Sequence, residues 1–201
     1  ILDAVVTAPI SKESWHMADA RWPGHTELFA ERCYSQRKAM MFVAGPLKLA
    51  LATIHEALFE IRNKFTIGCV FEPIDLLNDA LKEFFGIGRP RIAVCGLNPH
   101  AGENGQFGDE EQRIISPAIL LAQEAGIECY GPFAADTLFL KAARGAYDGV
   151  VAMYHDQGLI PVKLLAFDKA VNVTIGIPMI RTSPAHGTAF DIAGRGVASE
   201  S

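Results

Sequence analysis

Five short apolar segments alternate with helix-like stretches along the chain, and this alternation constrains the fold more than any other feature. The segments are rich in β-branched residues and end in turns or polar clusters, as buried strands do; they cover residues 3–11, 48–55, 91–100, 148–158 and 170–183. Between them, the sequence predicts helices over residues 27–32, 74–85 and 110–125. Strands that alternate with helices predict parallel sheets covered on both faces, so we expect an α/β fold.

The composition narrows the class of protein. Half of the 201 residues are hydrophobic, which is enough for one large α/β domain or two small ones. A net charge of -5 provides no basic stripe for duplex nucleic acid, and the apolar runs fall short of the roughly 18 residues that a membrane span needs. No signal peptide is visible at the start. We therefore expect a cytoplasmic protein with no nucleic-acid or membrane partner.

The cysteines and the chain ends give two further expectations. Cys33, Cys69, Cys95 and Cys129 stand singly without a CxxC pair, which indicates reduced core residues and argues against disulfides or a thiolate zinc site.

The chain begins inside a strand-like run and ends soon after a Gly-rich loop, so we expect a piece of a longer protein. Pro and Gly breaks, at 23–24, 161 and 194–196, indicate two lobes with a cleft between them.

Three of the six histidines, His55, His100 and His155, stand at the C-terminal ends of three separate predicted strands. Ligands of parallel α/β sheets bind beyond the carboxyl ends of the strands, so these imidazoles can meet at one point. Neutral imidazole is the commonest metal ligand, and three protein ligands with an open position are typical of a catalytic metal site. The alternative, that each histidine caps its strand and bonds backbone or water, stays open from the residues alone.

Other polar side chains are candidates for acid–base work or anion binding. Asp156 follows His155, where it can bind a metal, act as a base or orient the imidazole of His155. Asp136 is a similar candidate, but it also fits an ordinary helix N-cap. Cationic or hydroxylic groups suit a phosphate or carboxylate, and His25 and Thr26 open a helix whose dipole favours an anion; the group comprises Lys12, His25, Thr26, Lys163 and Arg181. Each lysine or arginine, taken alone, is more often a solvated surface charge.

Seven motifs in order resemble the 4-hydroxythreonine-4-phosphate dehydrogenase family of pyridoxal phosphate biosynthesis, which includes paralogues acting on 4-phospho-D-threonate and 4-phospho-D-erythronate. They are PGHTE (23–27), LATIH (51–55), GLNPHAGE (96–103), ADTLF (135–139), MYHDQG (153–158), VNVTIG (171–176) and IRTSPAHGTAFDIAG (180–194). That family is built like the isocitrate and isopropylmalate dehydrogenases. The resemblance implies a two-lobed α/β/α fold with mostly parallel sheets and an incomplete first lobe. Residues 17–163 would form the metal, substrate and dimerisation lobe, and 1–16 plus 164–201 a partial nucleotide-binding lobe.

The resemblance also implies roles for individual residues. His55, His100 and His155 match the ligands of one divalent metal, Zn, Co or Mg, and Asp136 and Asp156 match the catalytic acids. The matching substrate contacts are His25, Thr26, Lys163, Asn172 and Arg181. NAD would be held by the family's adenosine-binding loop, here His186, Gly187, Thr188, Ala189 and Asp191. This loop lacks the GxGxxG motif. From the residues alone, it also fits an ordinary Gly-rich connector. The family is homodimeric with its active site at the subunit interface, so the metal ligands need not come from one chain.

The implied reaction is NAD-dependent oxidation of 4-phosphohydroxy-L-threonine to 2-amino-3-oxo-4-phosphooxybutanoate, which decarboxylates to 3-amino-2-oxopropyl phosphate. Two departures bear on the substrate: Glu56–Ala57 replaces the Leu–Pro expected after LATIH, and TAPISK replaces TGPxxK. A paralogue that oxidises 4-phospho-D-threonate or 4-phospho-D-erythronate is therefore the alternative. A metallohydrolase using the same three histidines and a truncated, non-catalytic metal-binding protein also stay open.

Overall fold

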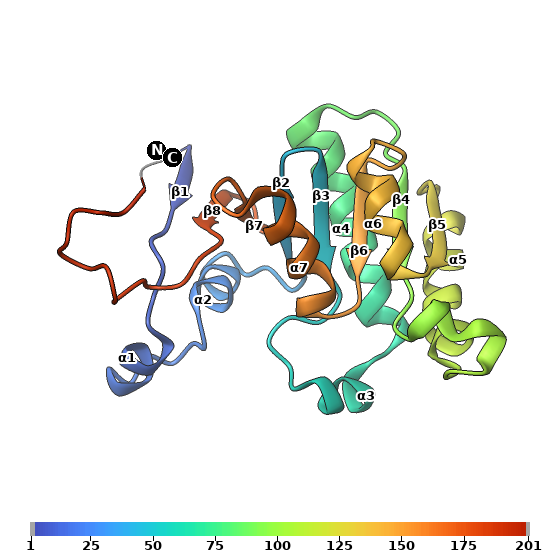
Figure 1. Cartoon of the computed structure of the whole chain (residues 1–201), viewed down its shortest axis with the longest axis horizontal. Helices are drawn as coiled ribbons and strands as arrows, with labels where there is room; N and C mark the ends of the chain where they lie inside the picture. The colour runs from blue at the N-terminus through green and yellow to red at the C-terminus, as the bar shows by residue number, and fades with distance from the viewer. Residues whose placement is uncertain (1–2, 200–201) are drawn as a thin grey trace.

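A computed structural model describes residues 3–199 as an α/β structure built on one mixed sheet (Figure 1). The strand order is β1-β8-β7-β2-β3-β6-β4-β5. Strands β3, β6, β4 and β5 run parallel, and β1 runs parallel to β8, whereas β2 and the β7–β8 hairpin pair in antiparallel fashion. The strands are β1 (Ala4–Val6), β2 (Ala39–Ala44), β3 (Leu47–Leu51), β4 (Ile92–Cys95), β5 (Cys129–Phe133), β6 (Gly149–Ala152), β7 (Val171–Ile175) and β8 (Ile180–Pro184).

Helices cover both faces of the sheet, as the alternation of elements predicts (Figure 1). Helices α4 and α5 cover one face, and α6 and α7 the other. No helix within residues 3–199 is long and apolar enough to cross a membrane. The α-helices are α1 (Lys12–Met17), α2 (His25–Arg32), α3 (Ile61–Lys64), α4 (Ile67–Phe85), α5 (Ser116–Glu124), α6 (Ala135–Ala143) and α7 (His155–Ala166), with 3-10 turns at Leu58–Glu60 and Pro99–Gly105 and a π-helical turn at Glu111–Ile115.

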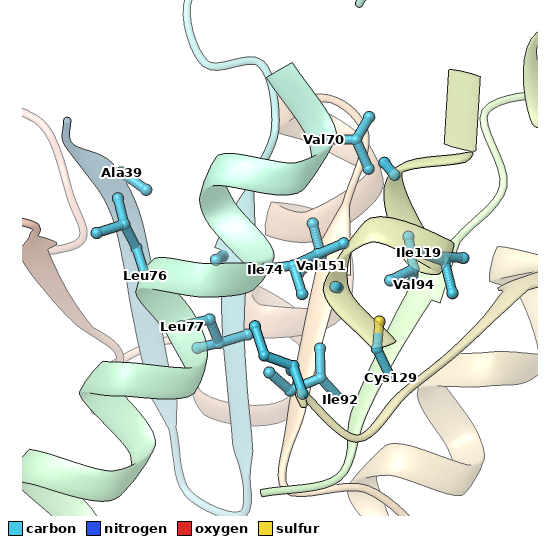
Figure 2. Close-up of a cluster of buried hydrophobic side chains, with 14 of the residues drawn as sticks. Ala39, Val70, Ile74, Leu76, Leu77, Ile92, Val94, Ile119, Cys129 and Val151 are labelled. Atoms are coloured by element: carbon cyan, nitrogen blue, oxygen red, sulfur yellow. The ribbon is translucent and has the colours of Figure 1, made fainter. Parts of the chain in front are cut away.

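The core forms because strand side chains alternate between the two faces. On β4, Ile92 and Val94 pack under α4 and α5, while Ala93 and Cys95 pack under α6 and α7. Figure 2 shows the first of these layers, with Leu77 of α4 among its side chains. Burial raises the pKa of both core thiols, that of Cys129 to about 12 and that of Cys95 further still. All four cysteines are free, as the sequence predicts.

Helix α4 shows how local signals and packing agree. It begins where the Thr66 hydroxyl accepts a hydrogen bond from the backbone N–H of Cys69 (3.3 Å), and it ends at Gly86, which is left-handed (φ 66°). Its apolar positions recur at helical spacing and are buried against the sheet. Gly149 of β6 lies directly beneath, where an added Cβ would come within 2.9 Å of Leu77. The helix can therefore approach the sheet closely at this point.

Several predicted elements need correction. The predicted strand over 170–183 is the β7–β8 hairpin, because Gly176 (φ +88°) turns the chain. The predicted strand over 148–158 ends at Ala152, and His155 begins α7. That helix contains Gly158 and Pro161, two residues that disfavour helices, so its pattern did not predict one. The sequence interpretation also missed β2, β5 and α6.

The predicted helices lie where expected, with shifted bounds. Helix α2 begins at His25, two residues earlier than predicted, and the helix predicted over 110–125 is a π-helical turn followed by α5. Strand β7, assigned to the nucleotide-binding lobe, pairs with β2 of the other predicted lobe within the same sheet. The division into lobes stays a prediction.

Replacing Leu77 with alanine is expected to lower the free energy of unfolding by about 2–5 kcal/mol, because the fully buried side chain would leave a cavity between α4 and the sheet. Urea denaturation followed by circular dichroism measures the change. The matched control is Leu121→Ala on α5, whose residue is 45% exposed and should cost less than about 1 kcal/mol. Equal losses in the two variants would contradict this account of the core.

Candidate active site

A cleft of about 600 Å³ gathers side chains from segments far apart in the sequence. Residues following β1 and β3, the start of α2 and the β7–β8 hairpin all line it. Seven of the predicted functional residues are among them, namely His25, Thr26, His55, Asn172, Arg181, His186 and Gly187. Lys12 lies there too. The topology thus collects most of the predicted anion-binding groups in one place.

Arg181 is the most deeply buried charge in this cleft and has the most definite partners. Its residue is 4% exposed, and its two terminal nitrogens donate to the hydroxyls of Thr174 (3.1 Å) and Thr7 (2.6 Å). Burial lowers its pKa, while Glu27 opposes that shift. Its Nε and the Oδ1 of Asn172 are buried without hydrogen-bond partners in the described chain. Buried polar groups are normally paired, so these two atoms mark a candidate polar binding site. The guanidinium suits an anion, whereas the amide oxygen suits a hydrogen-bond donor.

His25 and Thr26 enter the cleft from the first turn of α2. Gly24 precedes them as the N-cap and offers no side chain to the first helical N–H groups. Burial, with the nearby positive charge of Arg181, lowers the pKa of His25. The indole of Trp15 packs edge-on against its ring, with centroids 5.2 Å apart. This end of α2 therefore presents a neutral imidazole, a hydroxyl and a helix dipole that favours anions.

His55 and His155 come together beside the cleft. Their ring centroids are 5.8 Å apart, and with Asp156 they line an adjoining hollow of about 320 Å³. Burial is the main cause that lowers the pKa of His55, followed by Lys12, whose Nζ lies 3.3 Å from its Nδ1. Asp156 Oδ1 lies 2.7 Å from His155 Nδ1. A carboxylate bonded to Nδ1–H leaves Nε2 to bind a metal, which is the usual arrangement around metal-binding histidines.

His100 does not join the other two histidines within this chain. Its turn follows β4, and its ring lies near Phe107, with centroids 6.2 Å apart. Strand β6 lies between β4 and β3, so the two strands that precede His100 and His55 are about 10 Å apart. Within residues 3–199 no three His, Cys, Asp or Glu side chains lie close enough to hold one ion. The pair His55 and His155 fits a shared ion, but the triad is not assembled by one chain alone.

The remaining predicted residues lie outside the cleft. Asp136 is exposed in the first turn of α6. Lys163 on α7 donates from Nζ to the carbonyl of Ala185, and its ammonium lies 5.1 Å from the ring centroid of Phe167. The other members of the predicted nucleotide loop, Thr188, Ala189 and Asp191, follow β8 in an irregular loop, and only His186 and Gly187 reach the cleft. Their predicted roles are not tested by this geometry.

Two supporting residues escaped sequence reasoning. Thr7 and Thr174 hold the guanidinium of Arg181 although they are far apart in the sequence. Thr174 is the direct cross-strand neighbour of Arg181 in the β7–β8 hairpin. Recognition of the turn at Gly176 would have revealed that pair, whereas no local pattern links Thr7 to Arg181.

The chain matches a known family along its entire length. Residues 1–201 match the family model described as pyridoxal phosphate biosynthetic protein PdxA. Its curated relatives are named as dehydrogenases. The chain therefore belongs to the PdxA family, as the resemblance of its motifs implies.

Two curated relatives illustrate the range of the family. The 4-hydroxythreonine-4-phosphate dehydrogenase of Geobacter metallireducens is 55% identical over 197 residues, which cover 98% of this chain and 58% of that protein. The D-threonate 4-phosphate dehydrogenase of Salmonella typhimurium is 51% identical over 197 residues, covering 98% and 60%. The chain thus spans less than two thirds of the length of these relatives.

Solved structures agree on the fold. The crystal structure of 4-hydroxythreonine-4-phosphate dehydrogenase from Klebsiella pneumoniae matches with a TM-score of 0.89 and 46% identity, covering 98% of this chain and 60% of that one. Isocitrate dehydrogenase from Methylococcus capsulatus matches with a TM-score of 0.53 and 13% identity, covering 96% and 63%. That second likeness concerns the fold alone, and it confirms the predicted isocitrate dehydrogenase-like architecture.

Acidification is expected to weaken the fold through His25. Its pKa is lowered in the folded chain, so the unfolded state binds more protons as the pH falls through the ordinary value of about 6.5. Stability is therefore lost on going from about pH 7.5 to about pH 5.5, and His25→Asn should reduce that loss. Urea denaturation at both pH values measures it. His16→Asn, which alters an exposed histidine of α1, is the control, and an equal effect of both variants would exclude this role of His25.

Proposed function

We propose that the whole protein catalyses the NAD-dependent oxidation of 4-phosphohydroxy-L-threonine to 2-amino-3-oxo-4-phosphooxybutanoate, which decarboxylates to 3-amino-2-oxopropyl phosphate. The buried guanidinium of Arg181, which two threonine hydroxyls hold at a polar cleft, is the observation that carries this proposal. Lys12, His25 and Thr26 line the same cleft, so phosphate and carboxylate groups of a substrate find charge and hydrogen bonds there. A cytoplasmic location suits such a biosynthetic enzyme.

The residues of this chain divide the chemistry between binding and proton transfer. Arg181, Asn172 and the first turn of α2 hold the anionic groups, and this binding energy orients the reacting carbon. Asp156, beside His155, would take the proton of the substrate hydroxyl, and bound NAD would supply the acceptor for the hydride of the carbon that carries this hydroxyl. The bond to the carboxylate then breaks, carbon dioxide leaves, and its bonding electron pair stays on the carbon that is later protonated.

We propose that His55 and His155 bind one divalent ion, Zn, Co or Mg, and that His100 completes the site. The 5.8 Å between the first two rings and the carboxylate of Asp156 on His155 support this assignment. A bound divalent ion would supply a Lewis acid that polarises the substrate hydroxyl and carboxylate. The ion's identity stays open because imidazoles favour Zn or Co, whereas substrate oxygens favour Mg.

A homodimer would bring the separated groups together. His100 and Asp136 do not reach the cleft of their own chain, so we propose that they act at the cleft of a second subunit. The outer face of α6 and α7 suits such an interface, because it exposes large apolar side chains; these are Leu140 (57% exposed), Ile160 (59%), Leu164 (82%) and Phe167 (70%). Obligate homodimer interfaces are typically apolar surfaces of this kind.

The loop that follows β8 is the proposed nucleotide contact. His186 and Gly187 line the cleft, so NAD held by this loop would lie beside the substrate-binding residues. Lys163 fixes the start of the loop through the carbonyl of Ala185. Thr188, Ala189 and Asp191 are the remaining proposed contacts and lie on the exposed continuation of the loop.

A second candidate substrate is 4-phospho-D-threonate, with 4-phospho-D-erythronate as its close analogue. The observation in its favour is the 51% identity to the D-threonate 4-phosphate dehydrogenase of Salmonella typhimurium. These compounds share the phosphate, carboxylate and hydroxyl but lack the amino group. The same anion-binding cleft therefore serves either substrate, and assay must separate them.

NADH formation at saturating NAD, with a divalent metal and each candidate substrate in turn, tests the proposed reaction in the whole protein. Arg181→Met is expected to lower kcat/KM by about 100-fold, because a charged hydrogen-bond partner of the phosphate or carboxylate is lost. Arg91→Met, at the opposite edge of the sheet, is the matched control and should keep its activity. If no phosphorylated hydroxy acid gives NADH, the proposed reaction is contradicted. Release of phosphate without NAD would favour a metallohydrolase.

His155→Ala is expected to strip the bound metal, because too few imidazoles remain to hold it. Asp156→Asn should weaken metal binding by about 10–100-fold through the lost orientation of His155. Elemental analysis and calorimetric titration of the purified whole protein measure both effects, and His16→Ala is the control on exposed α1. Unchanged metal content in His155→Ala would show that this histidine is not a ligand.

A further inference from the structure

The turn that carries His100 has an unusual backbone. Five successive residues are left-handed: His100 (φ 52°), Ala101 (52°), Gly102 (80°), Glu103 (42°) and Asn104 (57°). Residues other than glycine rarely adopt this conformation because Cβ crowds the following carbonyl. Such a run persists only where surrounding contacts over-determine it, and strained backbone of this kind concentrates at functional sites.

The carboxylate of Glu111 supplies those contacts. Although Glu111 is charged, its residue is only 3% exposed. Its Oε1 accepts hydrogen bonds from the backbone N–H groups of Leu97 (2.8 Å) and Asn98 (2.7 Å), and its Oε2 accepts one from the Asn98 side-chain amide (3.0 Å). Charge-assisted bonds of this kind are about twice as strong as neutral ones. Glu111 also opens a π-helical turn, a feature found frequently at functional sites.

Two glycines let the turn fold tightly onto this carboxylate. A Cβ at Gly96 would lie 2.8 Å from Ala101 Cα and 3.1 Å from Glu111 Oε1. A Cβ at Gly102 would lie 2.7 Å from Glu111 Oε2. The carboxylate therefore lies against the residues that precede the left-handed run and against Gly102 in its middle, and the glycines of GLNPHAGE are required by that contact.

Gln157 connects the same turn to the one that carries His155. Its Oε1 accepts a hydrogen bond from the backbone N–H of Met153 (2.7 Å), at the end of β6. Its Nε2 donates to the carbonyl of Gly96 (2.8 Å), at the end of β4. Gln157 follows His155 by two residues in the first turn of α7. One side-chain amide thus ties together the turns that bear His155 and His100.

We propose that Glu111 and Gln157 are positioning residues that fix the His100 turn on its own subunit and so hold His100 in place for the metal site that the dimer completes. This inference rests on the proposed metal site, and neither residue contacts a metal or substrate itself. Glu111 holds Leu97 and Asn98, just before the left-handed run, and Gln157 holds Gly96 at the end of β4. Loss of either contact frees the backbone that carries His100 without removing a ligand.

The test uses the whole protein with three variants. Glu111→Gln keeps the size of the side chain but replaces one acceptor oxygen with a donor. Gln157→Met keeps the length and removes both hydrogen bonds. The matched control is Asp148→Asn, because Asp148 likewise accepts a backbone N–H beside β4, that of Arg91 (2.8 Å), but at the opposite end of the strand.

Two measurements separate positioning from general stability. Hydrogen exchange of the Leu97 and Asn98 amides should become at least about tenfold faster in Glu111→Gln and stay unchanged in Asp148→Asn. Titration with Co²⁺, followed by calorimetry and the visible spectrum of the bound ion, should show binding weakened about tenfold or more in Glu111→Gln and Gln157→Met. Asp148→Asn should bind Co²⁺ like the wild type.

The outcomes distinguish this inference from the proposed function. Wild-type protein that binds no Co²⁺ would reject the metal site itself, and the positioning role with it. Wild-type binding with equal affinities in Glu111→Gln, Gln157→Met and Asp148→Asn would overturn the positioning role alone. If Glu111→Gln does not fold, Gln157→Met carries the test, and an unchanged Co²⁺ affinity and spectrum in that variant overturns the inference.

Discussion

Burial of both faces of the central parallel strands is the constraint on which the rest of this structure depends. Strands β3, β6 and β4 are almost fully inaccessible to solvent. Alternate side chains therefore pack against α4 and α5 on one face and against α6 and α7 on the other. Their polar residues can then appear only where the strands end. Because the strands are parallel, those ends lie along one edge, and the histidine-bearing turns follow there.

The antiparallel half of the sheet builds the cleft that holds the predicted anion-binding residues. The β7–β8 hairpin places Arg181 beside Thr174, and β1 adds Thr7 to the same guanidinium. Burying that charge is costly unless hydrogen bonds and an opposite charge compensate. Glu27 provides part of the opposite charge, and two threonine hydroxyls accept hydrogen bonds from the terminal nitrogens. The cleft therefore combines a fixed cation with the uncapped start of α2.

Strand order also explains why the site spreads over a wide edge. Strand β6 lies between β3 and β4, so the His155 turn is central, with the His55 and His100 turns on either side. Of these three imidazoles, those of His55 and His155 approach each other within the chain. A homodimer that supplies the missing groups is consistent with the exposed apolar face of α6 and α7, and the hydrogen bonds of Glu111 and Gln157 keep the third histidine in a fixed place.

The sequence by itself determined the α/β class, the helix α4, the family and the main charged and imidazole side chains of the cleft, because periodicity and distinctive motifs are local properties of the chain. It did not determine that residues 170–183 form a hairpin, that His155 begins a helix, or that His100 lies apart from His55. Those features arise from contacts between distant residues, such as Thr7 with Arg181 and Gln157 with Gly96. Only the tertiary structure decided them, since strand order and a left-handed turn are stabilised by long-range packing and hydrogen bonds that no local pattern encodes.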